Sequence, residues 1–331
     1  MENAVHTPVL LKETLRLLEP PDGSGWMIDA TAGEGGHSEA FLERFPGLRV
    51  TCVDADASIL SVARDRLRKF GARASFYEGW SEDFFKAVLA AKETPDLDGG
   101  FKKKFFEKNA GQPPVVILID LGVSLYHYEK GGRGFSFRKD EPLDMRIDDS
   151  RGLSASRLLA SLREDEIAAL LWRGAEERYS RRIAAAIVKA RRAGALETSG
   201  ALASVVKGAV PASYRNCAFH PATKTFQALR IAVNGELELL GKRLEAAFSV
   251  LAKGGRLGVI SFHSSEDRIV KWFFREKSRS CVCPPEAPIC RCRGRPLLRL
   301  TVKKPAVPDA EEVEKNPASR SAKLRVAEKL E

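Results

Sequence analysis

The stretch that decides the fold reads Trp26-Met27-Ile28-Asp29-Ala30-Thr31-Ala32-Gly33-Glu34-Gly35-Gly36-His37. It begins with a short, mainly apolar run, which is typical of a buried strand, and the glycines that follow break this run. Helical spacing resumes at Phe41, Leu42 and Phe45. The stretch therefore predicts a strand, a glycine-rich turn and a helix.

The same alternation continues along the chain. Residues 49–54 predict a second strand, residues 59–70 a second helix and residues 74–77 a short third strand. Residues 115–120 read Val-Val-Ile-Leu-Ile-Asp, an unbroken β-branched run of the kind found in central parallel strands. Strands that alternate with helices predict an α/β fold with a parallel sheet covered on both faces.

Two stretches interrupt this alternation. Residues 92–113 contain glycine and proline pairs and a lysine run, which predicts a surface insertion with a short helix around Phe105. Between residues 136 and 216 helical spacing replaces the strand pattern, which predicts an inserted all-helical domain.

The sheet pattern returns after the helical stretch. Residues 225–251 have helical spacing, and residues 257–262 predict another strand. Residues 298–302 and 323–327 predict two strands that close the sheet as an antiparallel pair. The expected domains are residues 1–135 and 217–331, which together form the sheet, and residues 136–216, which form the helical insertion.

Composition and charge narrow the function classes. With 331 residues, 44% of them apolar, the chain can bury a large core, which excludes a disordered or fibrous protein. Lys and Arg number 54 against 44 Asp and Glu, and the net charge of +10 favours a polyanionic partner, although a merely basic soluble protein is the alternative. No apolar stretch is long enough for a membrane span and the cysteines form no disulfide framework, so we expect a cytoplasmic protein without a membrane partner.

Positive charge is concentrated in residues 173–192, within the predicted helical domain. Two acids, Glu176 and Glu177, stand against a larger set of cations. The cations are Arg173, Arg178, Arg181, Arg182, Lys189, Arg191 and Arg192. Such a helix face either contacts RNA phosphates or is simply solvated, and the sequence leaves both interpretations open.

The glycine turn and Asp54, which ends the next predicted strand, have the layout of a nucleotide-type site. Glycines let a ligand approach the backbone, and a carboxylate in this position accepts hydrogen bonds from ribose hydroxyls. A dinucleotide turn has a third glycine where Ser38 stands, and no phosphate-binding Walker loop is present. This favours S-adenosylmethionine, while a dinucleotide and a turn without function stay as alternatives.

Two further residues are placed to take part in this site. Trp80 follows the third predicted strand, where it covers an adenine face or belongs to the core. Asp120 ends the central strand, where open α/β sheets bind ligands, and the residues after it do not resume a helix. A helix cap is therefore the weaker interpretation of Asp120.

Two Cys-x-Cys pairs, Cys281 with Cys283 and Cys290 with Cys292, form a separate cluster. Four thiolates suit zinc, but paired zinc ligands more often have two residues between them. A loop of reduced thiols is the alternative, and we assign no metal ligand.

Several unusual strings, in order, carry a family resemblance. The chain resembles the ribosomal RNA small-subunit methyltransferase H family over nearly its whole length. The strings are His6-Thr7-Pro8-Val9-Leu10-Leu11, Gly35-Gly36-His37-Ser38, Asp120-Leu121-Gly122-Val123-Ser124, Arg133-Gly134-Phe135-Ser136-Phe137, Pro142-Leu143-Asp144-Met145-Arg146, His220-Pro221-Ala222-Thr223 and Ser261-Phe262-His263-Ser264.

This resemblance implies a class I, Rossmann-like methyltransferase sheet with an inserted helical domain. It implies S-adenosylmethionine-dependent N4-methylation of a cytidine in the decoding centre of bacterial 16S rRNA. The implied partners are 16S rRNA, within the assembled small subunit, and a second copy of the chain in a weak homodimer. The implied cofactor contacts are Gly35, Gly36, His37, Asp54, Trp80, Asp120 and His127, the last in place of the family's usual glutamine.

Residue chemistry limits the reaction without naming the base. Methylation of a pyrimidine at C5 uses a cysteine nucleophile, typically beside a proline, and no Pro-Cys pair occurs. Methylation of a nitrogen needs only that the amine be oriented and its proton accepted. Asp120 is the catalytic candidate, with a backbone carbonyl of its loop as an equal contender. Another nucleobase amine, or a noncatalytic RNA-binding assembly factor, remain the alternative functions.

Overall fold

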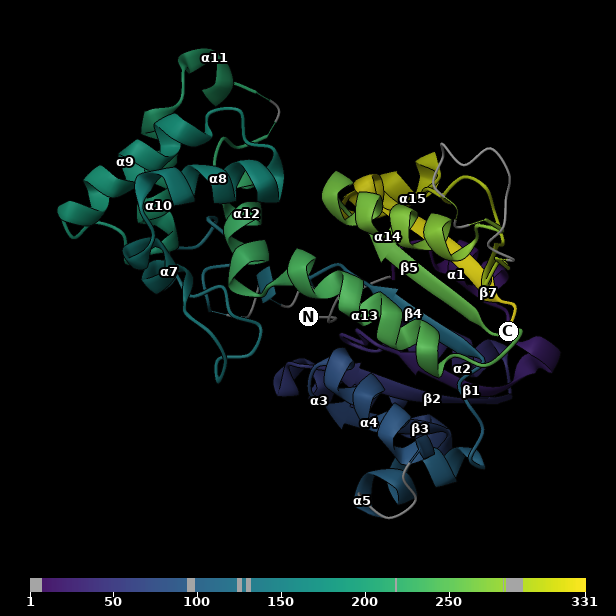
Figure 1. The fold of residues 1–331 in the computed structure, drawn as a ribbon. Helices are drawn as coiled ribbons and strands as arrows, with labels where there is room; N and C mark the ends of the chain where they lie inside the picture. Colours follow the sequence, from purple (N-terminus) through teal and green to yellow (C-terminus); the bar gives the residue numbers. More distant parts are fainter. Residues whose placement is uncertain are drawn as a thin grey trace. The chain divides into compact units, whose positions relative to one another are not determined.

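The computed structural model of the chain describes residues 8–93, 99–123, 127–128, 132–217, 219–281, 283 and 294–331. The chain divides into two compact units (Figure 1). We call residues 1–122 with 240–331 the sheet unit and residues 123–239 the helical unit.

The sheet unit contains a seven-stranded sheet in the order β3-β2-β1-β4-β5-β7-β6. Its first five strands are parallel, and β7 runs antiparallel to both β5 and β6, which confirms the predicted closing pair. The strands are β1 (Ser24–Asp29), β2 (Gly47–Asp54), β3 (Ala74–Glu78), β4 (Val116–Asp120), β5 (Arg256–Ser261), β6 (Leu298–Leu300) and β7 (Lys323–Lys329).

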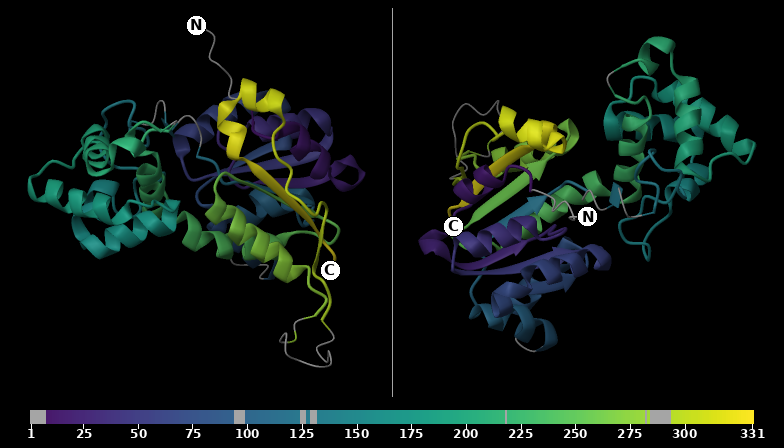
Figure 2. Two further views of the ribbon diagram at one scale, coloured as in Figure 1. Left: turned by 90° about the horizontal axis from the view of Figure 1, so that it is seen from above. Right: turned by 180° about the vertical axis from the view of Figure 1, so that it is seen from behind.

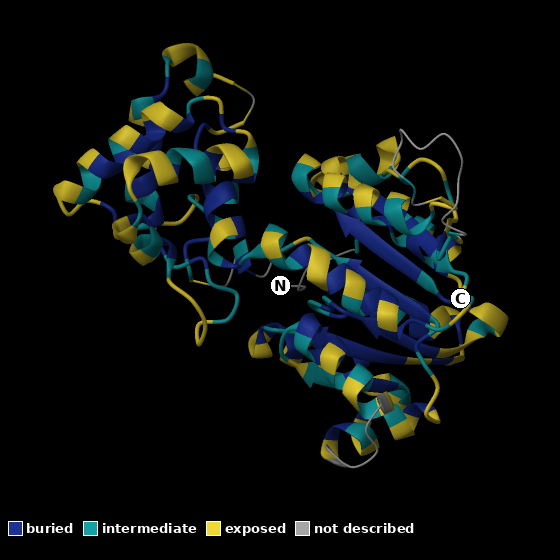
Figure 3. Ribbon diagram, viewed as in Figure 1, coloured by how far each residue is buried: buried dark blue, intermediate teal, exposed yellow. Residues whose placement is uncertain are grey.

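Strand β4 shows why the central strands are so uniformly apolar. Val116 and Leu118 belong to the core on one face of the sheet, and Ile117 and Ile119 to the core on the other. Alternate side chains of a strand point to opposite faces, so a strand covered on both faces is apolar throughout. Figure 3 shows the resulting buried centre of the sheet.

Helices cover both faces of the sheet (Figure 2). Side chains of α1, α2 and α3 pack into one core, and those of α4, α13 and α14 into the other.

None of the described helices is long and apolar enough to cross a membrane. The helices are α1 (Leu11–Leu17), α2 (Gly36–Arg44), α3 (Ala57–Leu67), α4 (Ser81–Glu93), α13 (Glu236–Val250), α14 (Ser264–Lys277) and α15 (Ala310–Lys315).

The predicted surface insertion contributes to the core. Its described part forms the short helical segments α5 (Gly99–Phe101), η3 (Lys102–Phe106) and η4 (Glu107–Asn109). Phe101 and Phe105 are buried and pack against the rings of Tyr77 and Phe84, with ring centroids 5.4 to 6.1 Å apart. The segment is therefore anchored by aromatic packing on the side of the sheet where β3 lies.

The helical unit has its own hydrophobic core. This unit includes residues on both sides of the predicted insertion, residues 136–216, and on the C-terminal side α12 supplies Phe226 and Leu229 to the core. Close packing of α8 on α12 requires Gly174, since a Cβ there would lie 2.8 Å from the Cα of Ala228. The helices are α7 (Ala155–Ser161), α8 (Glu164–Ala175), α9 (Ser180–Arg192), α10 (Ser199–Ala209), α11 (Ala212–Arg215) and α12 (Thr223–Val233).

Residues 225–251 are mostly helical, as their spacing predicts, but the helix is interrupted. The structure has two helices, α12 and α13, separated at Gly235, which adopts a left-handed conformation with φ of 60°. The side-chain oxygen of Asn234 accepts a hydrogen bond from the Ile147 N–H, and its NH₂ group donates to the Met145 carbonyl. These contacts hold the chain at the break, close to where it leaves the helical unit.

Candidate active site

Three neighbouring parallel strands end in an aspartate. Asp54 ends β2, Asp29 ends β1 and Asp120 ends β4, and these strands are adjacent in the sheet. The carboxyl ends of parallel strands share one edge, which is where open α/β sheets bind ligands. The three carboxyl groups interact, because Asp54 raises the pKa of Asp29 and Asp29 raises that of Asp120.

Asp54 holds the glycine turn against the end of β2. Its Oδ2 accepts a hydrogen bond from the Gly33 N–H at 2.9 Å, and its Oδ1 accepts from the Asp56 N–H at 3.0 Å. Each carboxylate oxygen can accept more than one hydrogen bond, so both can also receive a hydroxyl. Gly33 has φ of 52° and a Cβ there would meet no atom within 4 Å, so the turn is open at this residue.

A side chain at Gly35 or Gly36 would meet protein atoms. Gly35 precedes α2 with φ of 79°, and a Cβ on it would lie 3.2 Å from the Cβ of Ala63 in α3. A Cβ on Gly36 would lie 2.6 Å from the Cγ of Pro8. Both glycines therefore allow close packing of the turn, and their contact with a cofactor stays a prediction.

Asp29 is a buried acid that the sequence prediction missed. Its side chain, 1% exposed, accepts a hydrogen bond of 2.6 Å from the Ser38 hydroxyl, which in turn accepts from the Cys52 thiol at 3.2 Å. Burial raises the pKa of Asp29 to about 6, the Ser38 hydroxyl opposes this rise and the charge of Asp54 adds to it. Ser38 thus fills the position of the missing third glycine and ties α2 to the sheet.

Asp120 lies at the centre of this edge. Its side chain is 21% exposed, and its Oδ1 accepts a hydrogen bond from the Gly122 N–H at 3.0 Å. Burial raises the pKa of Asp120 to about 7, the Gly122 N–H opposes the rise, and the charges of Asp29 and Glu266 add to it. Asp120 can therefore gain or lose a proton near neutral pH.

The loop after β4 is held tightly against its neighbour. A Cβ on Gly122 would lie 2.7 Å from the ring of Phe262, so this position accepts only glycine without displacement. Glu266, 2% exposed, accepts hydrogen bonds from the N–H groups of Phe262 and His263 at the start of α14. Glu266 also caps α14, where its side chain accepts from the backbone before the helix.

His37 links the turn to Asp120. Its Nε2 lies 3.1 Å from the Val9 carbonyl oxygen, which can only accept, so this nitrogen carries a proton. Its Nδ1 then faces Oδ2 of Asp120 at 4.0 Å. The ring is buried, and its hydrogen bond to the Val9 carbonyl holds it beside the catalytic candidate.

Trp80 reaches the same edge, whereas His127 belongs to the other unit. The N–H of Gly79 donates to the Asp54 carbonyl at 2.8 Å, which places the half-buried Trp80 just beyond the ends of β2 and β3. His127 is buried in the helical unit, with its ring centroid 5.3 Å from that of Phe135. Its predicted cofactor contact stays a prediction.

The proposed cysteine cluster is described only in part. Cys281 is exposed and Cys283 is half-buried. Cys290 and Cys292 lie outside the described residues. Zinc ligands and a loop of reduced thiols therefore both stay as interpretations of the four cysteines.

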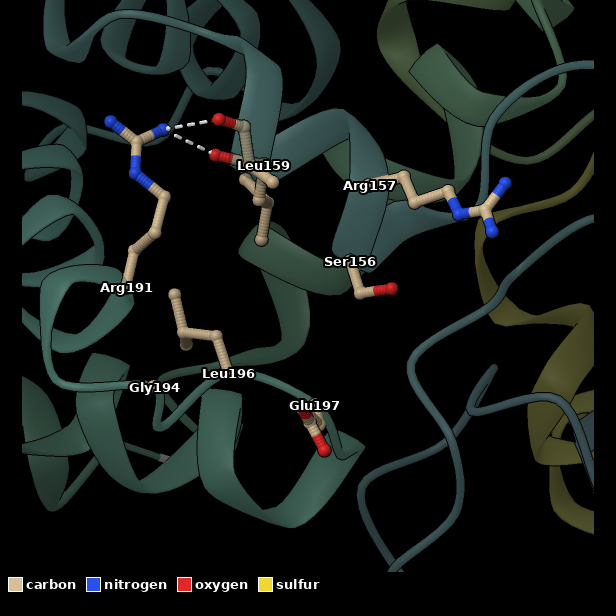
Figure 4. A pocket seen from close by; sticks show the side chains of 8 residues that line it. Ser156, Arg157, Leu159, Arg191, Gly194, Leu196 and Glu197 are labelled. Atoms are coloured by element: carbon tan, nitrogen blue, oxygen red, sulfur yellow. Dashed lines mark hydrogen bonds between the residues drawn. The ribbon is translucent and has the colours of Figure 1, made fainter.

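A pocket of about 280 Å³ lies in the helical unit, formed by residues of α7, α9 and the segment after α9 (Figure 4). Arg191 lines it and donates hydrogen bonds to the carbonyls of Leu159 and Leu162 at 2.6 and 2.7 Å. These carbonyls end α7, where a cation is favourable. Arg191 thus stabilises a helix end, and the pocket contains none of the predicted site residues.

Helix α9 presents a basic face. Ile183 and Ile187 are buried in the helical core, and α9 contains no acid. The exposed cations of the helix are Arg181, Arg182, Lys189 and Arg192. Just before the helix, the guanidinium of Arg178 lies over the rings of Tyr179 and Tyr214, at 4.9 and 4.8 Å from their centroids.

Comparison with known proteins agrees with this architecture. A protein of Treponema denticola named ribosomal RNA small subunit methyltransferase H is 50% identical, covering 99% of this chain and 98% of its own length. Proteins of the same name from Heliobacterium modesticaldum and Trichlorobacter lovleyi are 44% and 42% identical and are covered over 98% and 100% of their lengths. The model of the MraW methylase family matches residues 3–330. The chain belongs to the MraW methylase family, and its sheet unit has the class I methyltransferase fold.

Proposed function

We propose that this protein transfers a methyl group from S-adenosylmethionine to the exocyclic N4 amine of a cytidine in the decoding centre of 16S rRNA. The relatives named above support an rRNA substrate of the small ribosomal subunit. The single observation that carries the reaction is the position of Asp120, a mostly buried carboxyl at the centre of the ligand edge.

S-adenosylmethionine is the cofactor, and the charge of the edge suits it. Asp29, Asp54 and Asp120 make this edge anionic, which disfavours a pyrophosphate and favours a ligand with a positively charged sulfonium. When bound, S-adenosylmethionine supplies an electrophilic methyl group. Asp54 would accept hydrogen bonds from the ribose hydroxyls, and Trp80 would lie against the adenine.

Asp120 would orient the target amine and accept its proton. The lone pair of a cytosine amine is delocalised into the ring, so the amine gains nucleophilicity only as its N–H is drawn toward an acceptor. An Asp120 carboxyl with a pKa near 7 is a stronger base than an ordinary carboxylate and is largely ionised above neutral pH. The Asp120 carboxylate is preferred to a backbone carbonyl of the same loop because only the carboxylate can take up the proton.

The helical unit would bind the rRNA backbone. Exposed Arg181, Arg182, Lys189 and Arg192 on α9 can contact successive phosphates without an acid on the same helix. The target base must leave its stack, which costs less free energy when the folded subunit already exposes it. We therefore propose the assembled small subunit as the substrate. We also propose a cytoplasmic location and a homodimer that forms only weakly.

Labelled methyl transfer tests this proposal. Wild-type protein should transfer methyl from S-adenosylmethionine to small subunits faster than to naked 16S rRNA. Asp120→Asn should lose transfer by a larger factor than it loses cofactor affinity, measured by calorimetry, because the carboxylate acts on the amine. A protein that binds both ligands but transfers no methyl would instead be a noncatalytic assembly factor, and equal losses would limit Asp120 to cofactor binding.

A further inference from the structure

Helix α14 of the sheet unit presents an exposed tryptophan among cations. Trp272 is 64% exposed, and Lys271 and Arg275, one and three positions away, are also exposed. Residues three or four apart are neighbours on a helix surface, which also places the exposed Arg268 on this side. We call Arg268, Lys271, Trp272 and Arg275 the α14 stripe.

The opposite side of α14 anchors the helix. Val270 and Phe274 are buried in the sheet core, and the ring of Phe273 packs against Phe248, with centroids 6.4 Å apart. A helix held in this way cannot rotate to bury Trp272. The tryptophan therefore faces solvent as a fixed part of the surface.

The acids of α14 are engaged away from the stripe. Glu266 caps the start of the helix, and Asp267 accepts hydrogen bonds from Arg325 at 2.7 and 3.2 Å. Burial raises the pKa of Asp267, but the hydrogen bonds and charges of Arg325 and Lys323 outweigh this and hold it below its usual value. The remaining acid, Glu276, pairs with Arg279 at 2.9 Å. The acids of α14 are therefore not paired with Lys271 or Arg275 in these contacts.

We propose that the α14 stripe binds a single-stranded segment of rRNA, with one base stacked on Trp272 and phosphates contacted by Lys271 and Arg275. An aromatic ring gives a base a stacking surface, and flanking cations follow the backbone. A protein partner would also cover Trp272, but a ring flanked by the exposed cations Lys271 and Arg275 is complementary to a polyanion. The inference rests on the proposed RNA substrate and adds a contact outside the active site and outside α9.

Binding of a single-stranded oligonucleotide from 16S rRNA, followed by fluorescence anisotropy, tests the stacking. Trp272→Ala should weaken binding roughly 5- to 150-fold, the range for removal of one stacked aromatic residue. Trp272→Phe keeps a ring and should restore much of the affinity. Equal affinities of wild type and Trp272→Ala for this RNA would overturn the proposal.

The salt dependence tests the two phosphate contacts. Each contact to a single strand contributes about 0.7 to the slope of log affinity against log salt, so Lys271→Ala with Arg275→Ala should lower the slope by about 1.4. Lys242→Ala with Lys253→Ala removes the same charge from exposed positions of the sheet unit and should leave the slope nearly unchanged. Equal changes of the slope in the two double variants would mean that the stripe contributes only net charge, and the two phosphate contacts would be wrong.

Two further measurements separate this inference from the proposed function. S-adenosylmethionine affinity should be the same in all these variants, since none of them lies at the ligand edge. If wild type transferred no methyl but the variants lost RNA affinity as expected, the RNA contact of the α14 stripe would stand and the proposed methyl transfer would be wrong. If the variants lost affinity for assembled subunits but not for any rRNA, the stripe would be a protein-docking surface and the RNA contact would be wrong.

Discussion

The carboxyl of Asp120 makes the pH dependence of stability a direct test of the site. Its pKa rises from 3.8 to about 7, mainly through burial. Because the pKa is raised in the folded state, the folded chain binds this proton more tightly than the unfolded chain, and stability falls as the pH rises from about 4 to about 7. At about 1.4 kcal/mol for each tenfold change in the acid constant, complete ionisation costs about 4 kcal/mol.

Asp120→Asn removes this cost with little change in side-chain shape. Part of the free-energy cost of ionising Asp120 already applies at about pH 5. The side chain is 21% exposed and therefore partly solvated, which reduces the cost that is added above this pH. We expect the stability of the variant, relative to wild type, to increase by about 2 kcal/mol between about pH 5 and about pH 8.5.

Urea unfolding of both proteins at the two pH values measures this change. The exposed Asp22→Asn is a matched control, and its stability difference from wild type should be nearly the same at both pH values. An Asp120→Asn difference that does not grow with pH would refute the buried, charge-crowded environment of this carboxyl.

Three further predictions concern the ligands and the reaction. Asp54→Ala should weaken S-adenosylmethionine binding by about 1.5 to 3 kcal/mol through lost ribose hydrogen bonds, and unchanged affinity in a calorimeter would sink that assignment. Arg181→Glu with Arg182→Glu should lower rRNA affinity and flatten its salt dependence while cofactor affinity is kept, whereas an unchanged slope would make this face merely solvated. Asp29→Asn removes a charge that raises the pKa of Asp120, so the rise of methyl transfer with pH should move to lower pH, and a profile that stays in place would contradict the coupling.

The strands were predictable because the local pattern of apolar residues depends on which faces of a strand are buried. Residues 115–120 read as a central strand since β4 is covered on both faces. The break at Gly235 was not predictable in the same way, because helical spacing continues past it. At this break the Asn234 side chain donates to the Met145 carbonyl and accepts from the Ile147 N–H. Both partners lie far away in the sequence, so local spacing gives no sign of them.

The site was predictable where a residue stands at the end of a strand. Asp54 and Asp120 could be identified in this way, but Asp29 was taken as part of an apolar run, because its burial becomes visible only once α2 and Ser38 fold over it. In the basic residues 173–192, the sequence does not distinguish cations with a structural role from exposed ones. Arg191 and Arg181 look alike in sequence, yet the guanidinium of Arg191 donates to the last carbonyls of α7.

The identity of the methylated nucleoside tests the central claim most directly. Small subunits from cells that lack this enzyme would be incubated with the protein and labelled S-adenosylmethionine, and their 16S rRNA digested to nucleosides. We expect the label in N4-methylcytidine, and almost none from Asp120→Asn. Label in 5-methylcytidine or in a methylated adenosine would contradict it, and only the methyltransferase fold and its family would then stand.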